Sequence, residues 1–372
     1  MLGIRGNKDS YNVLTSLLND SDGLIREWST WGLRYYSEFS PKELFFNKLS
    51  DSRSAVRRYC IEGLVALGNV SCIDTIISQL GDEGATIRKA AVRGLGRHDS
   101  HLATQPLLAT LNDNDSNVRA SAATALGNLK ATEAVDALRL ALYDPDGSVG
   151  NAAADALGKI GDRGVVPALL TNLHTGRVKA LARLGVYEVI PFCQSVIRHT
   201  AEDASAQCTF GLIHLAPSTA LNVLQTCERR FPMKAWIMHH QAQAHWQLGD
   251  LDKAQASFEC ILALKLERNQ DILALAHYHL ETGNLDEALH LAKRADFENP
   301  FKALPLLTLA LVHYALDDLD QAKTYLQRAR IEDRRITDID DLKFEHFWRE
   351  KAVEYLEGLL AHEAHSGLNP QG

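Results

Sequence analysis

The sequence predicts an all-α protein in which two helical-repeat solenoids, each an α-α superhelix, follow one another. Two observations support this fold class: the first half repeats every 31 residues and the second half every 34. Periods of this length are typical of stacked helical units, because a single short unit cannot bury its own apolar face. The composition agrees, since 46% of the 372 residues are hydrophobic and 23% are charged, which suits a folded chain rather than a disordered one.

The 31-residue period is marked by an acidic turn that opens each copy. The turns begin at Asp20, Asp51, Asp82, Asp113 and Asp144. A leucine recurs at a fixed distance after each turn, at Leu33, Leu64, Leu95, Leu126 and Leu157, with small residues at helical spacing before it. Every copy also contains a second apolar segment, so each unit is predicted to be a pair of closely packed helices.

The pattern Asp-x-x-x-x-Val-Arg-x-x-Ala-x-x-Ala-Leu-Gly, preceded by an apolar helix, resembles the short HEAT-like repeats of phycobilisome lyases and many bacterial proteins. The resemblance covers residues 1–200. The first unit is incomplete, because Leu2-Gly3 stands where other copies are already half complete, and the last unit, near 174–190, is degenerate. The resemblance implies a solenoid scaffold and carries over no lyase residue, since the matching motif is generic.

A recurrent aspartate and arginine in the first array are interpreted as structural. We expect the carboxylates to cap helices and to accept charge-assisted hydrogen bonds from the guanidinium groups, which would form a ladder along one edge of the stack. Gly150 replaces the arginine of the fifth copy, so the ladder should end there. The ladder residues are Asp20, Arg26, Asp51, Arg57, Asp82, Arg88, Asp113 and Arg119.

The 34-residue period is set by three turns that begin at Gly249, Gly283 and Asp317 and continue Asn/Asp-Leu-Asp. With the alanine that opens the second helix of each copy, this pattern resembles tetratricopeptide repeats. We expect these repeats to span 201–336, with a divergent first copy, and expect a capping helix and tail over 337–372.

In tetratricopeptide families the first helix of each unit lines a concave groove that holds a peptide or a partner helix. The matching positions here are mostly apolar and aromatic: Trp236, His239, Gln243, Trp246, Leu273, His277, Leu280, Leu304, Leu307, Leu311 and Tyr314. Such a groove suits an amphipathic partner helix. The alternative, that the C-terminal helix of the chain itself packs there, stays open.

No catalytic, cofactor or metal site is predicted. The sequence contains no GxxxxGK[ST], GxSxG or HExxH motif, and its only His-Glu pair is His362-Glu363. His245, His279 and His313 recur every 34 residues. Stacked helices lie about 8–10 Å apart, whereas zinc needs its ligands at about 2 Å, so this column is expected to serve packing.

Nucleic-acid binding is weighed through local charge. Residues 1–200 hold 22 Lys and Arg against 21 Asp and Glu, whereas 201–372 hold 17 against 26. A possible anion-binding stripe consists of Arg58, Lys89, Arg93 and Arg97, but Glu62 and Asp155 interrupt it. A solvated face is the preferred interpretation, and nucleic acid is not the expected partner.

The expected function is a non-catalytic scaffold or adaptor that binds protein or peptide partners on the concave faces of its repeats. No apolar run long enough to span a membrane occurs, and the chain is expected to be cytoplasmic. A bilin-lyase-like or chaperone-like factor that acts only within a complex is the alternative, and nucleic-acid binding through the basic face is a lesser one. The partner and the oligomeric state are not predicted.

Overall fold

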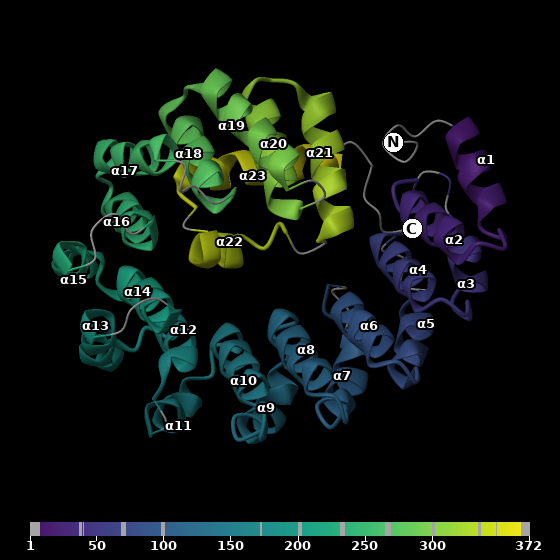
Figure 1. Cartoon of the computed structure of the whole chain (residues 1–372), viewed down its shortest axis with the longest axis horizontal. Helices are drawn as coiled ribbons and strands as arrows, with labels where there is room; N and C mark the ends of the chain where they lie inside the picture. Colours follow the sequence, from purple (N-terminus) through teal and green to yellow (C-terminus); the bar gives the residue numbers. More distant parts are fainter. Residues whose placement is uncertain are drawn as a thin grey trace. The chain divides into compact units, whose positions relative to one another are not determined.

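The computed structural model describes residues 8–36, 39, 41–67, 72–97, 101–171, 173–199, 203–230, 235–264, 269–299, 302–333, 336–346 and 348–365. Within these ranges every regular element is helical and no strand occurs (Figure 1). The predicted all-α helical-repeat fold is therefore confirmed. Residues 1–7, which include the start of the incomplete first repeat, lie outside the described residues.

The chain forms two compact units, which are described separately. The first comprises residues 1–160, 330–335 and 369–372, and the second comprises 161–329 and 336–368. This division does not follow the change of period, because residues 161–200 continue the 31-residue array in sequence but cluster with the second unit.

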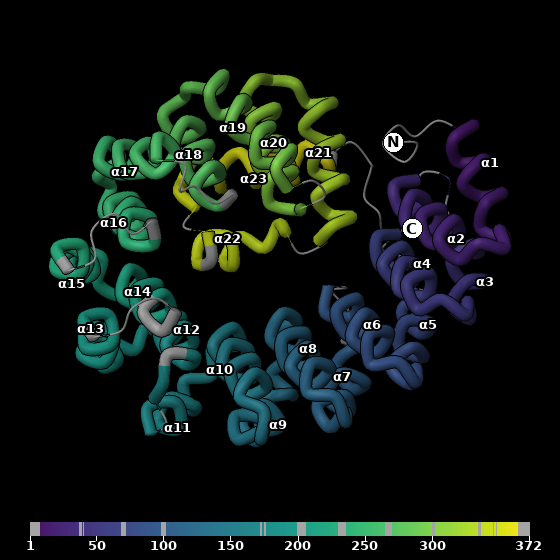
Figure 2. Tube along the Cα trace, viewed as in Figure 1, coloured from purple at the N-terminus to yellow at the C-terminus, as the bar shows by residue number. Residues whose placement is uncertain are grey.

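The first unit is a row of helical hairpins. Its α-helices are α1 (Lys8–Leu17), α2 (Gly23–Leu33), α3 (Lys42–Asn47), α4 (Ser54–Leu67), α5 (Ile73–Ser78), α6 (Ala85–Arg97), α7 (Thr104–Thr110), α8 (Ser116–Asn128), α9 (Val135–Ala141) and α10 (Gly147–Ile160). Short 3₁₀ turns stand at Gln79–Gly81, His101–Ala103 and Thr132–Ala134. Helices α2, α4, α6, α8 and α10 pack in sequence against one another, and each odd-numbered helix packs on the even-numbered helix that follows it (Figure 2).

Close packing of small residues sets the spacing of this row. The recurrent leucines, Leu33, Leu64, Leu95, Leu126 and Leu157, are all fully buried. A Cβ placed on Gly127 would lie 2.5 Å from Cα of Ala156, and one on Gly96 would lie 2.6 Å from Cβ of Ala125. Helices α6, α8 and α10 therefore approach at a distance that glycine alone permits at these two positions.

The second unit begins with helices that continue the 31-residue array, and the helices of the 34-residue array follow them. Its α-helices are α11 (Val166–Thr171), α12 (Thr175–Arg183), α13 (Ile190–His199), α14 (Asp203–Leu215), α15 (Pro217–Arg230), α16 (Ala235–Leu248), α17 (Leu251–Ala263), α18 (Asn269–Thr282), α19 (Leu285–Glu298), α20 (Ala303–Ala315), α21 (Leu319–Glu332), α22 (Ile339–His346) and α23 (Glu350–His365), with 3₁₀ turns at Arg163–Val165 and Tyr187–Val189. Helices α16 and α17 form a hairpin, as do α18 and α19.

The three acidic turns of this array share one backbone geometry. Gly249, Gly283 and Asp317 adopt φ values of 81°, 83° and 59°. The amide of the following residue then donates to a carbonyl five residues back, as Asp318 does to His313 at 2.9 Å. This left-handed conformation after a helix favours glycine. Asp317 adopts it although its Cβ makes the conformation less favourable.

The C-terminal segment forms two helices rather than the single one that the sequence predicts. Helix α23 packs on α18 and α20, the first helices of two successive repeats. Helix α22 contacts α12 and α14 through Phe344, whose ring lies 4.2 Å from that of His214 and 4.1 Å from the guanidinium carbon of Arg183. Phe347, which was expected to belong to the capping helix, lies outside the described residues.

Candidate partner-binding pocket

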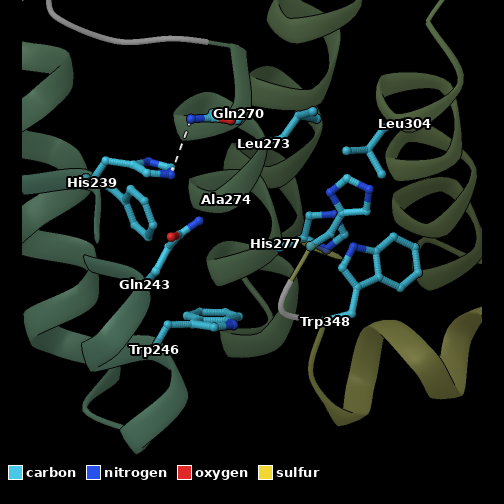
Figure 3. Close-up of a pocket in the computed structure, with 11 residues that line it drawn as sticks. His239, Gln243, Trp246, Gln270, Leu273, Ala274, His277, Leu304 and Trp348 are labelled. Atoms are coloured by element: carbon cyan, nitrogen blue, oxygen red, sulfur yellow. Dashed lines mark hydrogen bonds between the residues drawn. The ribbon is translucent and has the colours of Figure 1, made fainter. Parts of the chain in front are cut away.

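A cavity of about 80 Å³ lies among side chains of α16, α18 and α20 and of the C-terminal segment (Figure 3). We call it the groove pocket. It is lined by His239, Gln243, Trp246, Phe258, Gln270, Leu273, Ala274, His277, Leu304, His346 and Trp348. Six of the eleven proposed groove positions, namely His239, Gln243, Trp246, Leu273, His277 and Leu304, are brought together here. The 34-residue period assigns these six residues to the first helices of three successive repeats, α16, α18 and α20. Because those helices lie next to one another, the six residues line one cavity.

A buried carboxylate orients His239 at one end of the groove pocket. Nδ1 of His239 hydrogen bonds with Oδ1 of Asp271, a residue that is only 1% exposed. The amide nitrogen of Gln270 lies 3.3 Å from Nε2 of the same ring and can only donate (Figure 3). The imidazole therefore carries its proton on Nδ1, donates it to Asp271, and uses its other nitrogen to accept from Gln270.

His277 has the opposite arrangement. The hydroxyl of Thr308 donates to the carbonyl of Leu304 at 3.0 Å, so it is an acceptor for Nε2–H of His277 at 3.2 Å. Nδ1 of His277 then carries a lone pair, and that atom is buried without a hydrogen-bond partner. Burial, the larger cause, and the charge of the nearby His346 together lower the pKa of His277 to about 3. His277 is thus neutral over the physiological range.

Two more polar atoms of the pocket lining are buried and unpaired. They are Oε1 of Gln243, an acceptor, and the Nε1–H of Trp348, a donor. The apolar part of the lining is formed by Leu273, Ala274 and Leu304 together with Trp246 and Phe258, which are 5% or less exposed, whereas His239, Gln270 and His346 add polar groups. Buried polar groups are usually paired, but these three atoms are themselves inaccessible, so they lie behind the surface of the cavity.

The other groove positions are covered by the chain itself. Leu307 and Leu311 are fully buried in a core that includes Leu356 and Leu359 of α23. The ring of Tyr314 lies 6.0 Å from that of Tyr355. This part of the array therefore contains the C-terminal helix of the chain, the occupant that the sequence left as an alternative, rather than an open groove. Leu280 also belongs to this core.

Trp236 lies on α16 outside the groove pocket. Its ring meets that of His240 edge to face at 6.2 Å, and its Nε1 is buried without a partner. His240 is held by its own helix, because its Nδ1 lies 2.6 Å from the carbonyl of Trp236 and donates to it.

Polar contacts hold the C-terminal segment against the repeats. Arg349 donates to the carbonyl of Trp246 at 2.7 Å, and Lys351 donates to the carbonyl of Glu281 at 2.7 Å. Both cations thus meet the carbonyl ends of α16 and α18, where the helix dipole favours positive charge. The carboxylate of Glu281 accepts from the amide of Ala352 at 3.2 Å, near the start of α23. These contacts fix Trp348 as one wall of the groove pocket.

The aspartates and arginines of the first array form ion pairs between neighbouring units. Arg88 donates through Nε and Nη2 to the carboxylate of Asp113, at 2.7 Å each, and through Nη1 to the carbonyl of Asp82 at 3.0 Å. The same bidentate contacts join Arg26 to Asp51, Arg57 to Asp82 and Arg119 to Asp144. Each arginine thus bridges its own turn and the aspartate of the next copy, 25 residues on. The last pair joins Arg119 to Asp144, and Gly150 stands at the position of the next arginine.

These pairs hold the carboxylates ionised. The guanidinium hydrogen bond is the main cause that lowers the pKa of Asp51, Asp113 and Asp144, and burial opposes it. Each carboxylate also accepts from a backbone amide two residues on, as Asp113 does from Asp115 at 2.9 Å. Asp20 makes the corresponding bond to the amide of Asp22 at 2.8 Å.

Two of the four charges of the basic stripe in the first array are paired with carboxylates. Arg58 pairs with Glu62 at 3.1 Å and stacks on Tyr59, and Glu62 also accepts from Arg34 at 2.6 Å. Arg97 lies 3.8 Å from the carboxylate of Asp333, within the same compact unit. Lys89 is half-buried and Arg93 is exposed. With two of its four charges paired, the stripe offers little to a phosphate backbone.

Two histidines of the 34-residue column, His245 and His313, lie close to aspartates of the turns that follow them. Nδ1 of His313 lies 3.1 Å from Oδ2 of Asp318, and Nδ1 of His245 lies 3.4 Å from Oδ2 of Asp250. Over the described residues, no group of three or more His, Cys, Asp or Glu is placed to hold a metal ion. No helix in the described part of the chain is long and apolar enough to cross a membrane.

Comparison with family models agrees with both periods. A model of HEAT repeats matches residues 43–119 and 104–183, and a model of a tetratricopeptide repeat matches residues 237–268. The chain carries HEAT repeats and a tetratricopeptide repeat. Arrays of these kinds present extended surfaces for recognition, and the chain is accordingly a helical-repeat scaffold of the protein-interaction type.

Several solved structures are also similar to the chain. The complex of CpcE and CpcF of phycocyanin lyase from Nostoc sp. PCC7120 matches at 22% identity, over 59% of this chain and 94% of that chain, with a TM-score of 0.38. The E. coli protein YibA matches at 21% identity, over 64% and 92%, with a TM-score of 0.42. An engineered protein matches at 18% identity, over 57% and 97%, with a TM-score of 0.34. These TM-scores are too low to carry structural or functional weight. No curated protein matches the sequence.

Sequence reasoning missed five residues that line the groove pocket, namely Phe258, Gln270, Ala274, His346 and Trp348. It also missed Asp271, which lies behind the lining and hydrogen bonds with His239. Asp271 stands 32 residues after His239, close to one repeat, so a search for a carboxylate opposite each groove histidine would have found this pair. Trp348 had no such signal, because its position depends on how the C-terminal segment folds back.

Proposed function

We propose that the chain is a non-catalytic adaptor that captures a protein partner on the concave face of its tetratricopeptide array, with the groove pocket as the anchor site. The observation that carries the proposal is the cavity itself, which stays open beside a groove whose other half contains α23. Its aromatic and aliphatic walls suit the side chain of a partner, since desolvated pockets that accept one anchor dominate protein recognition.

The covered half of the groove restricts how a partner binds. An amphipathic helix that docks along a whole groove needs anchors over about two turns. Here Leu307 and Leu311 are fully buried, so only the part around α16 and α18 is accessible to such anchors. The proposed partner therefore inserts one main side chain into the groove pocket and makes rim contacts around it.

Filling the pocket tests the proposal. Ala274 lines the cavity on α18, and Ala274→Leu would occupy the cavity while the helix keeps a good helix former. The matched control is Ala256→Leu, because Ala256 is exposed on α17. We expect the Ala274 variant to lose about ten-fold or more in affinity for a purified partner, by calorimetry, and the Ala256 variant to bind as the wild type does. Equal binding by both variants, with unchanged thermal unfolding, would exclude the pocket.

A further inference from the structure

A carboxylate from the segment 330–335 is bound just after helix α2. The hydroxyl of Tyr35 donates to Oε1 of Glu332 at 2.6 Å, and Nη2 of Arg34 lies 3.9 Å from the same oxygen. The segment belongs to the first compact unit, so this contact lies within that unit. The side chain of Glu332 is 14% exposed. A hydroxyl and a guanidinium group thus hold a largely buried carboxylate here.

Neighbouring side chains fix the guanidinium group of Arg34. Its Nη1 donates to Glu62 at 2.6 Å. Its Cζ lies 5.6 and 5.4 Å from the ring centroids of Tyr35 and Tyr59, and its side chain is 7% exposed. A group that is already ordered loses little freedom when a ligand binds. Arg34 and Tyr35 therefore form a preorganised carboxylate-binding site.

The chain's own segment fits this site loosely. Nη2 of Arg34 lies 3.9 Å from the carboxylate of Glu332. The adjacent Asp333 reaches Arg97, but its Oδ1 lies 3.8 Å from Nε. Both distances exceed the about 2.7–2.9 Å of a hydrogen bond between a guanidinium group and a carboxylate. A ligand whose carboxylates approach more closely can therefore compete with the segment.

Helix α6 extends the site with cations that the segment does not reach. Lys89, Arg93 and Arg97 stand four residues apart, on one face of the helix. The segment contacts the last of the three through Asp333. Over the part of the chain that the structure describes, neither Lys89 nor Arg93 pairs with a carboxylate. The stripe thus has room for an acidic ligand with more than two carboxylates.

The charges around the site favour an anion. The nearest acid apart from the segment is Glu62, which pairs with both Arg34 and Arg58. Glu27, at the position equivalent to Arg58 in the preceding copy, is paired with Arg53 at 2.5 Å. Positive charge is in excess once the segment leaves, and Arg330 leaves with it. The cations that stay are Arg34, Arg58, Lys89, Arg93 and Arg97.

We propose that this basic face, made by Arg34, Tyr35, Lys89, Arg93 and Arg97, binds an acidic peptide of a partner protein. The chain's own Glu332 and Asp333 stand in for that peptide. Because these two adjacent residues reach Tyr35 and Arg97, neighbouring carboxylates of a peptide can do so as well. The basic face lies in the first compact unit and the groove pocket in the second, so the inference goes beyond the proposed function.

A peptide suits the basic face better than a nucleic acid does. The bound oxygen at Tyr35 belongs to a side chain that is 14% exposed. A glutamate carboxylate reaches such a position on a flexible stem, whereas the phosphates of a nucleic acid belong to its backbone. Glu62 also interrupts the row of cations that a phosphate backbone would follow.

Vacating the site in the full chain tests the proposal. The double variant Glu332→Gln/Asp333→Asn removes both carboxylates of the segment. The probe is a fluorescein-labelled hexapeptide of alternating glutamate and aspartate, titrated by fluorescence anisotropy at low ionic strength. A segment that fills the site nine-tenths of the time lowers the apparent affinity about ten-fold, so we expect the double variant to bind about ten-fold tighter than the wild type. Equal affinities, or no binding by the double variant, would overturn the proposal.

Single changes made in the double variant locate the binding. Tyr35→Phe removes only a hydroxyl and Arg93→Gln only an exposed charge, and thermal unfolding checks that both variants stay folded. Each should weaken the peptide by about three- to ten-fold. The matched control is Arg139→Gln, which removes an exposed cation elsewhere in the same unit and should not weaken it. Unchanged binding in both site variants, or an equal loss in the control, would refute the site.

Two further probes separate the peptide from other ligands. A hexapeptide of glutamine and asparagine should not bind, because it lacks the carboxylates. An oligothymidylate with the same net charge as the acidic peptide should bind the double variant more weakly than that peptide. Equal or tighter binding of either probe would overturn the acidic peptide, and the second result would favour a nucleic acid instead.

Discussion

The ladder between neighbouring HEAT units makes a quantitative prediction at Arg88. The arginine donates two hydrogen bonds of 2.7 Å to Asp113 and others to the carbonyls of Asp82 and Glu83 at 3.0 and 3.1 Å. The side chains of Arg88 and Asp113 are 16% and 10% exposed. Removal of Arg88 leaves Asp113 with the bond from the Asp115 amide, and water reaches part of the vacated site. We expect Arg88→Ala to cost about 1–3 kcal/mol.

The same variant has a predicted pH dependence. In the folded chain the pKa of Asp113 is lowered, mainly by Arg88, whereas an unfolded aspartate titrates near about 3.9. A carboxylate with a lowered folded pKa contributes stability that is present above its unfolded pKa and is lost as the pH falls through its folded pKa. The cost of Arg88→Ala should therefore be largest near neutral pH and should shrink as the pH falls below about 4.

Urea unfolding at neutral and acidic pH, followed by circular dichroism, measures this cost, and hydrogen exchange of α6 and α8 assigns it to the ladder. Arg139→Ala is the matched control, because the pair of Arg139 with Asp136 is 3.7 Å long and its side chains are 41% and 96% exposed. Exposed pairs contribute about 0–1 kcal/mol. An Arg88 variant as stable as the Arg139 variant, or a cost that grows on acidification, would refute the reasoning.

Three further predictions concern packing, backbone and titration. Gly127→Ala should destabilise the fold by about 1–3 kcal/mol although alanine has the better helix propensity, because the new Cβ would lie 2.5 Å from the backbone of Ala156. The control Gly147→Ala should leave stability unchanged, because a Cβ there meets nothing within 4 Å. Equal melting temperatures of the two variants would contradict this prediction. Asp317→Gly should stabilise by about 1 kcal/mol in urea unfolding, since φ is 59°, and a loss of stability would show that the aspartate side chain matters more. The pKa of His277 in the folded chain is lowered to about 3, so its neutral form contributes stability that is full above about pH 6.5 and declines as the pH falls toward 3. His277→Gln should flatten this fall of the unfolding free energy with pH. An unchanged pH dependence would exclude His277 as its source.

The sequence predicted the repeat architecture because the determinants of a solenoid are local and recur. The buried leucines, the acidic turns and the small residues at helix contacts each follow from one period. The partner of each ladder arginine was less evident: spacing placed Asp82 and Arg88 together, whereas the carboxylate that Arg88 binds belongs to the next copy, Asp113. That choice depends on how neighbouring hairpins stack.

The candidate site was predicted only in part, for a physical reason. Positions such as His239 and Trp246 lie on the first helices of repeats, and the period alone assigns them to one face. The cover over Leu307 and Leu311 comes from α23, whose docking depends on single contacts such as Lys351 with the carbonyl of Glu281. Contacts between a repeat array and a segment outside the repeat carry no periodic signal.

Site-specific crosslinking tests the central claim most directly. A photoreactive residue placed at His346, which is exposed at the rim of the groove pocket, is compared with one placed at Arg93, exposed in the first unit. The proposal predicts that the His346 position crosslinks one segment of a purified partner and that Ala274→Leu abolishes this crosslink. A crosslink from Arg93 alone, or one from His346 that Ala274→Leu leaves intact, would contradict capture through the groove pocket.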